Sequence, residues 1–320
     1  MSKVRQSRKP SLPDVSVVVP LLNEEESLRE LYSQIETTLR GAHMTFEVIF
    51  IDDGSTDGSF EVLKELHRTH PEVKAIRFRR NFGKSAALSV GFKHAVGTFV
   101  VTMDADLQDD PAEIPGMLAT MGDRYDLVSG WKKKRYDPLT KTIPSRFFNF
   151  VTAKMTGIDI HDFNCGLKAY RREVVKGVNV YGELHRYIPA LAHWAGYRVT
   201  EQPVHHHARK YGHTKFGISR FFNGFLDLLT VLFTTRYIRR PLHLFGIWGF
   251  VSIIIGALID GYLSVEWALD KTTLSNRPLF LVGFMFIIIG IQFVSIGLLG
   301  EMISRHEQDE EVYSISETIE

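Results

Sequence analysis

The stretch Val101-Thr-Met-Asp-Ala-Asp-Leu-Gln-Asp-Asp110 changes abruptly from apolar to acidic side chains. Phe99 to Met103 predicts a short buried strand, and polar side chains follow at Asp104, Asp106, Gln108, Asp109 and Asp110. In α/β proteins, ligands bind at the carboxyl ends of parallel strands. Asp-X-Asp with a Gln two residues later also offers the oxygen ligands that Mg²⁺ and Mn²⁺ accept. The alternative is a solvated acidic turn before a helix that starts near Pro111.

The chain before this stretch alternates between short β-branched runs and helical patterns. The predicted strands are Val15 to Pro20, Phe46 to Ile51 and Val73 to Phe78. Three helices are predicted. The first runs from Leu28 to Gly41, the second begins after Asp57 and ends at His67, and the third begins at Ser85. This alternation favours right-handed βαβ units, so we expect an α/β fold with a parallel sheet covered on both faces. No Gly-X-Gly-X-X-Gly follows the first strand, which disfavours a dinucleotide-binding site.

Polar clusters follow three of the predicted strands at the point where each strand ends. They are Asn23-Glu24, Asp52-Asp53 and Asp104-Ala-Asp106. In a parallel sheet these clusters meet at one edge, where crowded carboxylates repel unless a metal, or a base and ribose, joins them. With the cations Lys84, Lys132 and Arg209, such an edge could hold a nucleoside diphosphate.

The overall composition excludes several classes of function. Positive and negative residues nearly cancel, with 38 Lys and Arg against 37 Asp and Glu, so no global field favours nucleic acid. Cys165 is the one cysteine of the chain, which excludes an intramolecular disulfide framework and a multi-cysteine zinc site. The run His205-His-His207 does not favour zinc either, because neighbouring side chains on a strand point to opposite faces.

The pattern after the acidic stretch is less regular. Ser129 to Arg135 predicts a basic loop, and Val199 to Val204 predicts an edge strand. Aromatic-rich helices are expected over 143–155 and 216–233. Ordinary core packing and a position on the membrane surface are both open for these helices, and the apolar segments that follow favour the membrane surface.

Two apolar segments near the C-terminus are long enough to cross a membrane. They are Leu242 to Leu263 and Leu279 to Leu299, and as helices each would span a hydrocarbon layer of about 30 Å. Three arginines precede the first segment, at Arg236, Arg239 and Arg240. This charge bias predicts a cytoplasmic position for the large domain and for both termini.

A series of motifs resembles those of a known enzyme family. In chain order they are Val17-Val-Val-Pro-Leu-Leu-Asn-Glu-Glu25, Ile51-Asp-Asp-Gly-Ser-Thr-Asp57, Arg80-Asn-Phe-Gly-Lys84, Asp104-Ala-Asp-Leu-Gln-Asp109, Asp162-Phe-Asn-Cys-Gly-Leu-Lys-Ala-Tyr-Arg171 and Arg209-Lys-Tyr-Gly-His-Thr-Lys215. They resemble the family 2 glycosyltransferases of the GT-A fold. More narrowly, the chain resembles the polyprenyl-phosphate glycosyltransferases, the branch that includes dolichol-phosphate mannose synthase and bacterial bactoprenol glucosyltransferases. The resemblance covers roughly residues 14 to 305.

This resemblance implies roles for individual residues. The base and ribose would be held by Pro20, Leu22, Glu24 and Asp53, and the ribose and diphosphate would be bordered by Asp104 and Ala105. The divalent cation, Mg²⁺ or Mn²⁺, would be held by Asp106 and Gln108. The phosphates would be met by Lys132, Arg209 and Lys215. Leu22 departs from the Tyr of some mannose synthases, so the identity of the base stays open.

The residues expected to be catalytic are Asp104, Asp106 and Asp162. Asp162 would act as a base or position the sugar, and its alternative role is to cap a turn before Gly166. Asp109 and Asp110 are instead expected to favour the N-terminus of the helix near Pro111.

The implied activity is metal-dependent, inverting transfer of a hexosyl group from a nucleotide sugar to undecaprenyl or another polyprenyl phosphate. UDP-glucose is the favoured donor, while UDP-linked amino sugars, N-acetylhexosamines, galactose and GDP-mannose remain open. One alternative is a processive membrane polysaccharide synthase, which would usually show a Gln-X-X-Arg-Trp motif and more spans. The other is an inactive membrane scaffold that only binds nucleotide.

The expected organisation follows from these assignments. It comprises a basic tail (1–12), a GT-A catalytic domain (13–212), an amphipathic membrane-interface helix (213–240), two transmembrane helices (241–300) and an acidic cytoplasmic tail (301–320). We expect a homo-oligomer in the cell inner membrane, with the lipid bilayer, the nucleotide sugar and the polyprenyl phosphate as its partners and no nucleic acid.

Overall fold

The computed structural model describes most of the chain. The described residues are 12–133, 149–154, 156–180, 182, 184–207, 210, 241–269 and 278–307. The chain divides into two compact units, Met1–Leu228 with Ser314–Glu320 and Leu229–Tyr313. The predicted interface helix over 213–240, residues 1–11 of the predicted basic tail and the acidic tail beyond residue 307 lie outside the described residues.

The first unit is built on a mixed sheet. Within its described residues the sheet has seven strands, in the order β3-β2-β1-β4-β6-β5-β7. The strands are β1 (Val15–Leu21), β2 (Phe46–Asp52), β3 (Val73–Arg77), β4 (Phe99–Thr102), β5 (Leu127–Trp131), β6 (Lys168–Arg171) and β7 (Val199–Pro203). β6 runs antiparallel to both β4 and β5, whereas the other neighbouring pairs are parallel. The α/β class is therefore confirmed, and the four strands predicted from the alternating pattern, β1 to β4, are parallel as expected. The sequence pattern does not predict the antiparallel strand β6.

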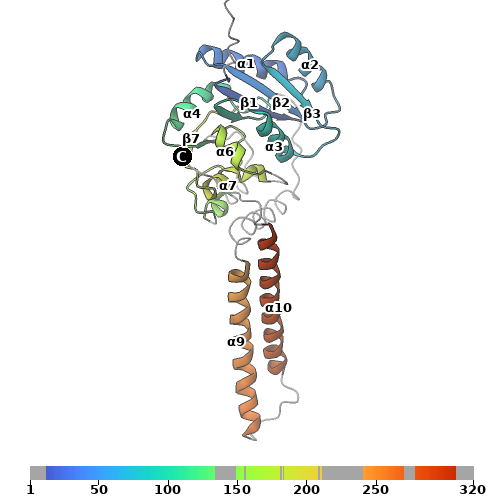
Figure 1. The fold of residues 1–320 in the computed structure, drawn as a ribbon, viewed down its shortest axis with the longest axis vertical. Coiled ribbons are helices and arrows are strands. Elements are labelled where there is room, and N and C mark those ends of the chain that lie inside the picture. The colour runs from blue at the N-terminus through green and yellow to red at the C-terminus, as the bar shows by residue number, and fades with distance from the viewer. Residues whose placement is uncertain are drawn as a thin grey trace, which may run out of the picture. The chain divides into compact units, whose positions relative to one another are not determined.

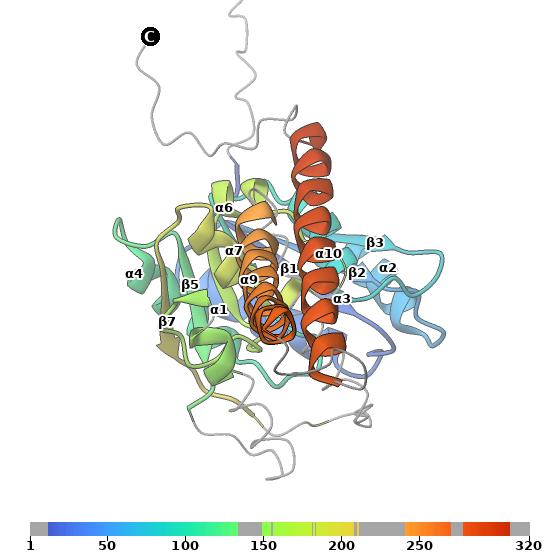
Figure 2. The same cartoon turned by 90° about the horizontal axis from the view of Figure 1, so that it is seen from below.

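Helices cover both faces of this sheet (Figure 1). One face packs against α1 (Leu28–Gly41), α2 (Ser59–Thr69) and α4 (Ile114–Met121), which follows the short 3₁₀ helix η1 (Pro111–Glu113). The other face packs against α3 (Lys84–His94), α6 (Arg172–Gly177) and α7 (Ile188–Trp194) (Figure 2). The short 3₁₀ helix η2 (Leu184–Arg186) comes between α6 and α7 in the chain. Alternate strand residues supply the two cores, as Val17 and Val19 face the first and Val18 faces the second.

The second half of the sheet shows where the sequence pattern misled. Ser129 and Gly130 lie in β5 and not in the predicted basic loop. These small residues suggest a turn, but Gly130 is required by packing, because an added Cβ would lie 2.8 Å from the sulfur of Cys165. The edge strand predicted from Val199 is confirmed as β7, at the end of the sheet.

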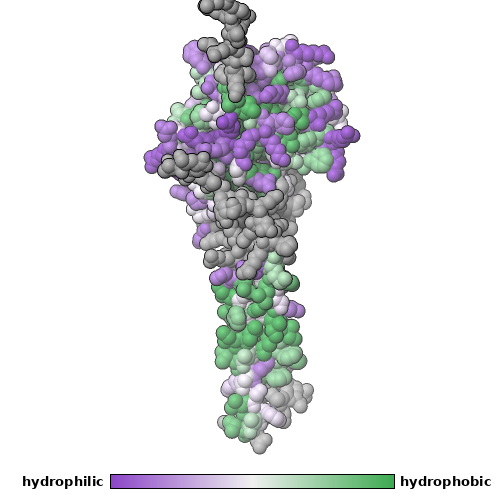
Figure 3. Space-filling view, in the orientation of Figure 1, coloured by the Kyte–Doolittle hydropathy of each residue, from purple (hydrophilic) through white to green (hydrophobic). Residues whose placement is uncertain are grey.

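The second unit contains, among its described residues, the helices α9 (Pro241–Ala268) and α10 (Pro278–Glu307). Apolar side chains cover most of their surface (Figure 3). The apolar stretches of both helices are long enough to cross a membrane. Only 22% of the stretch in α9 and 11% of that in α10 is buried, whereas the core helices of a soluble protein are mostly buried. The helices pack closely where glycines meet, at Gly249 with Gly290 and Gly256 with Gly283. Both predicted apolar spans are confirmed as helices, and α10 continues past the predicted boundary at residue 300.

Candidate active site

The predicted polar edge lies where the order of the strands reverses. β2 and β4 pair with opposite sides of β1, and all three strands are parallel. The carbonyl of Val18 accepts a hydrogen bond from the main-chain N–H of Met103 after β4 (3.3 Å), and the carbonyl of Leu21 accepts one from the main-chain N–H of Asp53 after β2 (2.9 Å). Because main-chain groups alternate between the two sides of a strand, the backbone nitrogen of Pro20 faces the β4 side. β4 has already ended there, so the missing N–H of Pro20 removes no ladder hydrogen bond. Such a switch point is the usual ligand site of a doubly wound sheet.

The loops that follow β1 and β2 are hydrogen-bonded to each other. Asn23 has a left-handed φ of 57°, its N–H donates to Ser55 Oγ (2.9 Å), and its side-chain oxygen accepts from the N–H of Thr56 (2.8 Å). The N–H of Glu24 donates to Ser59 Oγ (2.9 Å). These contacts bring together the residues predicted to meet the base and ribose, which are Pro20, Leu22, Glu24 and Asp53.

Asp53 links this region to the start of α3. Its side chain is almost fully buried, and its two oxygens accept from the N–H groups of Phe82 (2.7 Å) and Gly83 (2.9 Å). Because α3 begins at Lys84, these hydrogen bonds place that ammonium group at the edge of the sheet. The first observed function of Asp53 is therefore to hold this loop, and its predicted contact with the nucleotide stays a prediction.

Asp104 is the first acidic residue after β4. Its side chain is 34% exposed and forms an ion pair with Lys84. Burial would raise the pKa of the Asp104 carboxyl, but the charges of Lys84 and Lys132 hold that pKa well below its ordinary value. Asp104 is therefore ionised at neutral pH, beside the ammonium group of Lys84.

Asp106 and Gln108 lie on either side of a strained residue. Leu107 has a φ of 59°, a left-handed conformation that costs a non-glycine residue about 1 kcal/mol or more. The turn lets Asp106 Oδ1 accept from the N–H of Gln108 (3.3 Å). Both side chains are half-buried, and their oxygen atoms form a donor set of the kind that Mg²⁺ and Mn²⁺ prefer.

The structure separates the roles of Asp109 and Asp110. Asp110 caps η1, as predicted, by accepting from the N–H of Ala112 (2.9 Å). The same expectation is wrong for Asp109, which is fully buried and lies 3.0 Å from the ammonium of Lys132. Burial alone would lower the pKa of Lys132, but Asp109 raises it above its ordinary value. Asp109 is therefore the buried ion-pair partner of Lys132 within the loop after β4.

The segment that begins at Asp162 packs directly against this loop. Asp162 is fully buried, and its carboxylate accepts from the N–H of Asn164 (3.0 Å), so it caps a turn. A Cβ added at Gly166 would lie 2.7 Å from the carboxyl group of Asp104 and 2.8 Å from that of Asp109. The glycine thus permits the close approach that brings the Asp162 turn to the acidic loop.

Sequence reasoning missed Lys168. This lysine is 4% exposed and donates to the carbonyls of Phe163 (3.3 Å) and Cys165. Burial lowers the pKa of Lys168 below its ordinary value, and the charge of nearby Lys84 contributes to the shift. The available signal was a single charge inside the apolar run Leu167-Lys-Ala-Tyr170, although it lay within a motif already recognised as a whole.

Comparison with known proteins assigns this geometry to a family. The sequence model described as glycosyl transferase family 2 matches residues 16–178. The chain belongs to glycosyl transferase family 2. The matched region of this glycosyltransferase contains the polar loops that follow β1, β2 and β4, and it also contains the Asp162 turn.

Curated relatives of this glycosyltransferase match it over nearly its whole length. The dodecaprenyl-phosphate galacturonate synthase of Rhizobium johnstonii is 38% identical over 299 residues, which are 91% of this chain and 88% of the relative. The undecaprenyl-phosphate 4-deoxy-4-formamido-L-arabinose transferase of Salmonella choleraesuis is 36% identical over 297 residues, 92% of this chain and 89% of the relative. The predicted resemblance to polyprenyl-phosphate glycosyltransferases is thereby confirmed.

A solved structure supports the GT-A fold of the family 2 domain. Glucosyl-3-phosphoglycerate synthase from Mycobacterium tuberculosis, in complex with Mn²⁺, UDP and phosphoglyceric acid, matches with a TM-score of 0.53 at 17% identity. The match covers 71% of this chain and 84% of that chain. At this identity the likeness concerns the fold alone.

Two predicted phosphate-binding residues, Arg209 and Lys215, lie outside the described residues. The predicted site residues that are described come from the ends of β1, β2, β4 and β5 and from the Asp162 turn. Lys132, the predicted basic residue at the end of β5, is 14% exposed at its side chain and is engaged with Asp109.

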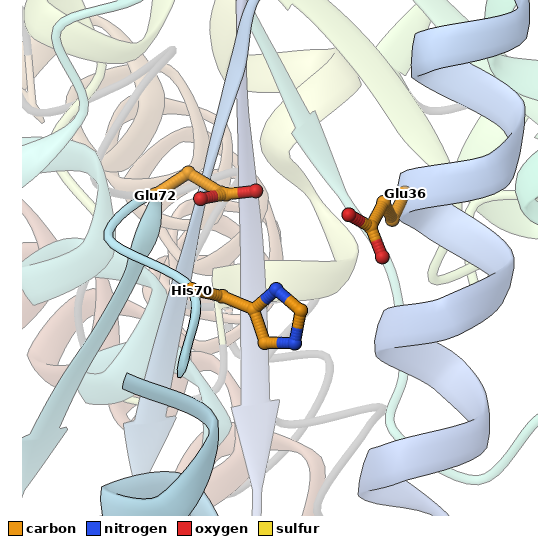
Figure 4. Close-up of side chains that lie close together, drawn as sticks. All are labelled: Glu36, His70 and Glu72. Carbon is orange, nitrogen blue, oxygen red and sulfur yellow. The ribbon is translucent and has the colours of Figure 1, made fainter. Parts of the chain in front are cut away.

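A second carboxylate group of this glycosyltransferase lies at the opposite edge of the sheet. Glu36 of α1 approaches His70 and Glu72, which precede β3 (Figure 4). Arg40 lies 2.9 Å from each of the two carboxylates, and the hydroxyl of Tyr32 donates to Glu72 (3.0 Å). Arg40 therefore offsets part of the charge of these two acids, and the group forms an ion-pair network away from the polar loops.

Proposed function

We propose that this glycosyltransferase moves a sugar from a nucleoside diphosphate to the phosphate of a polyprenyl lipid. The observation that carries the proposal is the loop after β4, which carries Asp104, Asp106 and Gln108 at the switch point of the sheet and in which Asp104 pairs with Lys84. The names of two curated relatives, which act on dodecaprenyl and undecaprenyl phosphate, support the acceptor. The apolar helices α9 and α10 suit an enzyme whose acceptor is a membrane lipid.

The proposed donor site uses the residues predicted from the sequence. The base and ribose would lie against Pro20, Leu22, Glu24 and Asp53, with Asp104 and Ala105 bordering the ribose and diphosphate. Asp106 and Gln108 would hold Mg²⁺ or Mn²⁺, because their carboxylate and amide oxygens suit a hard cation. When bound, the cation would neutralise the charge that develops on the leaving diphosphate.

The reaction needs little proton transfer. A lipid phosphate is already ionised near pH 7, so its oxygen can attack the anomeric carbon while the bond from that carbon to the diphosphate breaks. This single displacement inverts the anomeric configuration. Lys84 is suited to follow the growing charge, because its ammonium is 32% exposed and pairs with Asp104. Lys132, Arg209 and Lys215 remain the predicted phosphate contacts.

We assign Asp162 a positioning role and not that of a base. Its carboxylate is buried and already accepts from the N–H of Asn164. A base is also dispensable for an ionised acceptor. Asp162 would therefore shape the turn that supports Asp104 through Gly166.

The donor sugar is the finer part of the proposal. The resemblance to two-span bacterial members of the family favours UDP-glucose, whereas the names of the relatives concern galacturonate and 4-deoxy-4-formamido-L-arabinose. We place UDP-linked galacturonate and formamido-arabinose ahead of UDP-glucose for this reason. All three belong in the first donor panel.

We also propose that the enzyme resides in the cell inner membrane as a homo-oligomer, with the catalytic domain in the cytoplasm. The orientation rests on the arginines at 236, 239 and 240, which precede the first apolar segment. The oligomer rests on the amphipathic segments predicted from the sequence.

Incubation of membranes with labelled donors and undecaprenyl phosphate tests the function. The proposal predicts label in a lipid that mild acid cleaves, because a glycosyl phosphate bond is acid-labile. Label in a polymer would favour the processive polysaccharide synthase. No incorporation from any donor of the panel would favour the nucleotide-binding scaffold and would contradict the proposal.

A further inference from the structure

Residues 205–207 pair with the loop that carries Asp106 and Gln108. His206 forms an isolated antiparallel bridge with Asp109, and the N–H of His207 donates to the carbonyl of Gln108 (2.9 Å). In return, the side-chain amide nitrogen of Gln108 donates to the carbonyl of His207 (3.4 Å). His207 therefore holds both the main chain and the side chain of Gln108.

This contact decides which way the Gln108 amide points. The carbonyl oxygen of His207 can only accept hydrogen bonds, so the NH₂ group of the amide must face it. The Oε1 atom of Gln108 then lies on the other side of the amide, where it can serve as an oxygen ligand. Groups that orient a metal ligand in this way commonly determine metal affinity.

His207 is itself anchored by its side chain. Its Nε2 lies 3.2 Å from Oδ2 of Asp110, the residue that caps η1. The neighbouring His206 is buried, with Nδ1 4.0 Å from Oδ1 of Asp109. The side chain of His205, by contrast, is 85% exposed. Glu113 Oε1 accepts a hydrogen bond from the main-chain N–H of His205 (3.0 Å) and lies 3.9 Å from its Nε2.

The same segment is attached to α1 by Lys210. The Nζ atom of Lys210 lies 2.9 Å and 2.8 Å from the two carboxylate oxygens of Glu30. Glu30 is in the first turn of α1, directly after the loop that ends β1. Residues 205–207 and 210, called the strap below, thus connect the loop after β4 with the helix after β1.

We propose that His207 and Lys210 are positioning residues. They orient Gln108 toward the divalent cation, and they hold the loop after β4 in a fixed position relative to the start of α1. The inference rests on the proposed function where it treats Gln108 as a metal ligand. The main-chain contacts of His207 with Gln108 depend on two side-chain attachments, of the His207 imidazole to Asp110 and of Lys210 to Glu30. Loss of either side-chain attachment should weaken binding of the cation with the nucleotide and leave the stability of the fold unchanged.

The test is equilibrium binding of Mn²⁺ in the presence of UDP to the purified full-length protein, with free Mn²⁺ read by electron paramagnetic resonance. His207→Ala and Lys210→Glu should each weaken Mn²⁺ binding about fivefold, as expected for exposed contacts that act on a metal ligand. Glu30→Lys should have the same effect. The double variant Glu30→Lys with Lys210→Glu should return to within about twofold of wild type, because it restores the ion pair with its charges exchanged.

Two matched controls separate positioning from general disturbance of the surface. His205→Ala removes a neighbouring imidazole that lies 3.9 Å from Glu113, whereas the imidazole of His207 contacts Asp110. Lys64→Glu breaks a comparable exposed pair with Glu61 on α2 (2.8 Å). Both controls should bind Mn²⁺ like wild type, and thermal unfolding should be equal in all variants.

Wild-type binding in His207→Ala and Lys210→Glu would overturn the proposal, and so would a double variant that binds no better than the single variants. The variants could show the predicted order of Mn²⁺ affinities while the wild-type protein transfers no sugar to polyprenyl phosphate. That result would support the role of the strap and contradict the proposed acceptor. The two ideas therefore fail separately.

Discussion

Replacing Asp109 with Asn should destabilise the first unit strongly. The Asp109 carboxylate is fully buried and 3.0 Å from the Lys132 ammonium, whose side chain is 14% exposed. Breaking a buried ion pair by neutralising one partner typically costs about 3–5 kcal/mol, because the other charge stays buried. Asp104 still offsets part of the Lys132 charge, so we expect a loss of about 3 kcal/mol. For a unit of this size, that loss lowers the melting temperature by roughly 6–12 °C.

The assay is thermal unfolding of the purified full-length protein in detergent, followed by tryptophan fluorescence, since Trp131 adjoins Lys132. The matched control is Asp110→Asn, which should shift the melting temperature by no more than about 2 °C, because Asn caps a helix as well as Asp does. Asp109→Asn combined with Lys132→Met should recover most of the loss, since it removes both buried charges. A shift for Asp109→Asn no larger than that of Asp110→Asn would refute the reasoning.

Three further substitutions test the parts around this ion pair. Asp162→Asn should keep turnover within about tenfold of wild type at saturating lipid, because the residue positions a turn. Loss of a catalytic base would lower turnover about 10²–10⁴-fold, and a loss of that size would show that Asp162 is the base. Gly166→Ala should raise the metal concentration for half-maximal transfer at least about tenfold, because the new Cβ would lie 2.7 Å from the Asp104 carboxyl group; an unchanged metal requirement would contradict this packing argument. Asp53→Asn should raise the donor KM about tenfold, because an N–H group of the loop before Lys84 then faces an amide NH₂; an unchanged KM would show that this loop does not support the donor site.

Much of the fold followed from local sequence pattern. The β-branched runs after Val15 and Phe46 are too short and too uniformly apolar for surface helices, and they form the buried strands β1 and β2. Because consecutive parallel strands end at one edge, the sequence alone predicts that the polar residues after these strands lie together. The apolar C-terminal segments were equally clear from length and composition.

The interior of the site could not be predicted in the same way. Asp109 and Asp110 are identical neighbours in sequence, yet Asp109 is buried against Lys132 and Asp110 caps η1. Lys168 lies in β6, a short strand inserted antiparallel between β4 and β5, and no local pattern announces such an insertion. Partners far apart in the chain determine these roles, and single-residue propensities do not contain that information.

The central claim is that Asp106, at the loop after β4, supports metal-dependent transfer of sugar to a lipid phosphate. The most direct measurement is the rate of sugar transfer to undecaprenyl phosphate against Mn²⁺ concentration, in wild type and in Asp106→Ala, with purified full-length protein. We predict that wild-type transfer rises with Mn²⁺ and disappears on chelation, while Asp106→Ala shows no metal-dependent transfer. Retained metal-dependent transfer in Asp106→Ala would contradict the account.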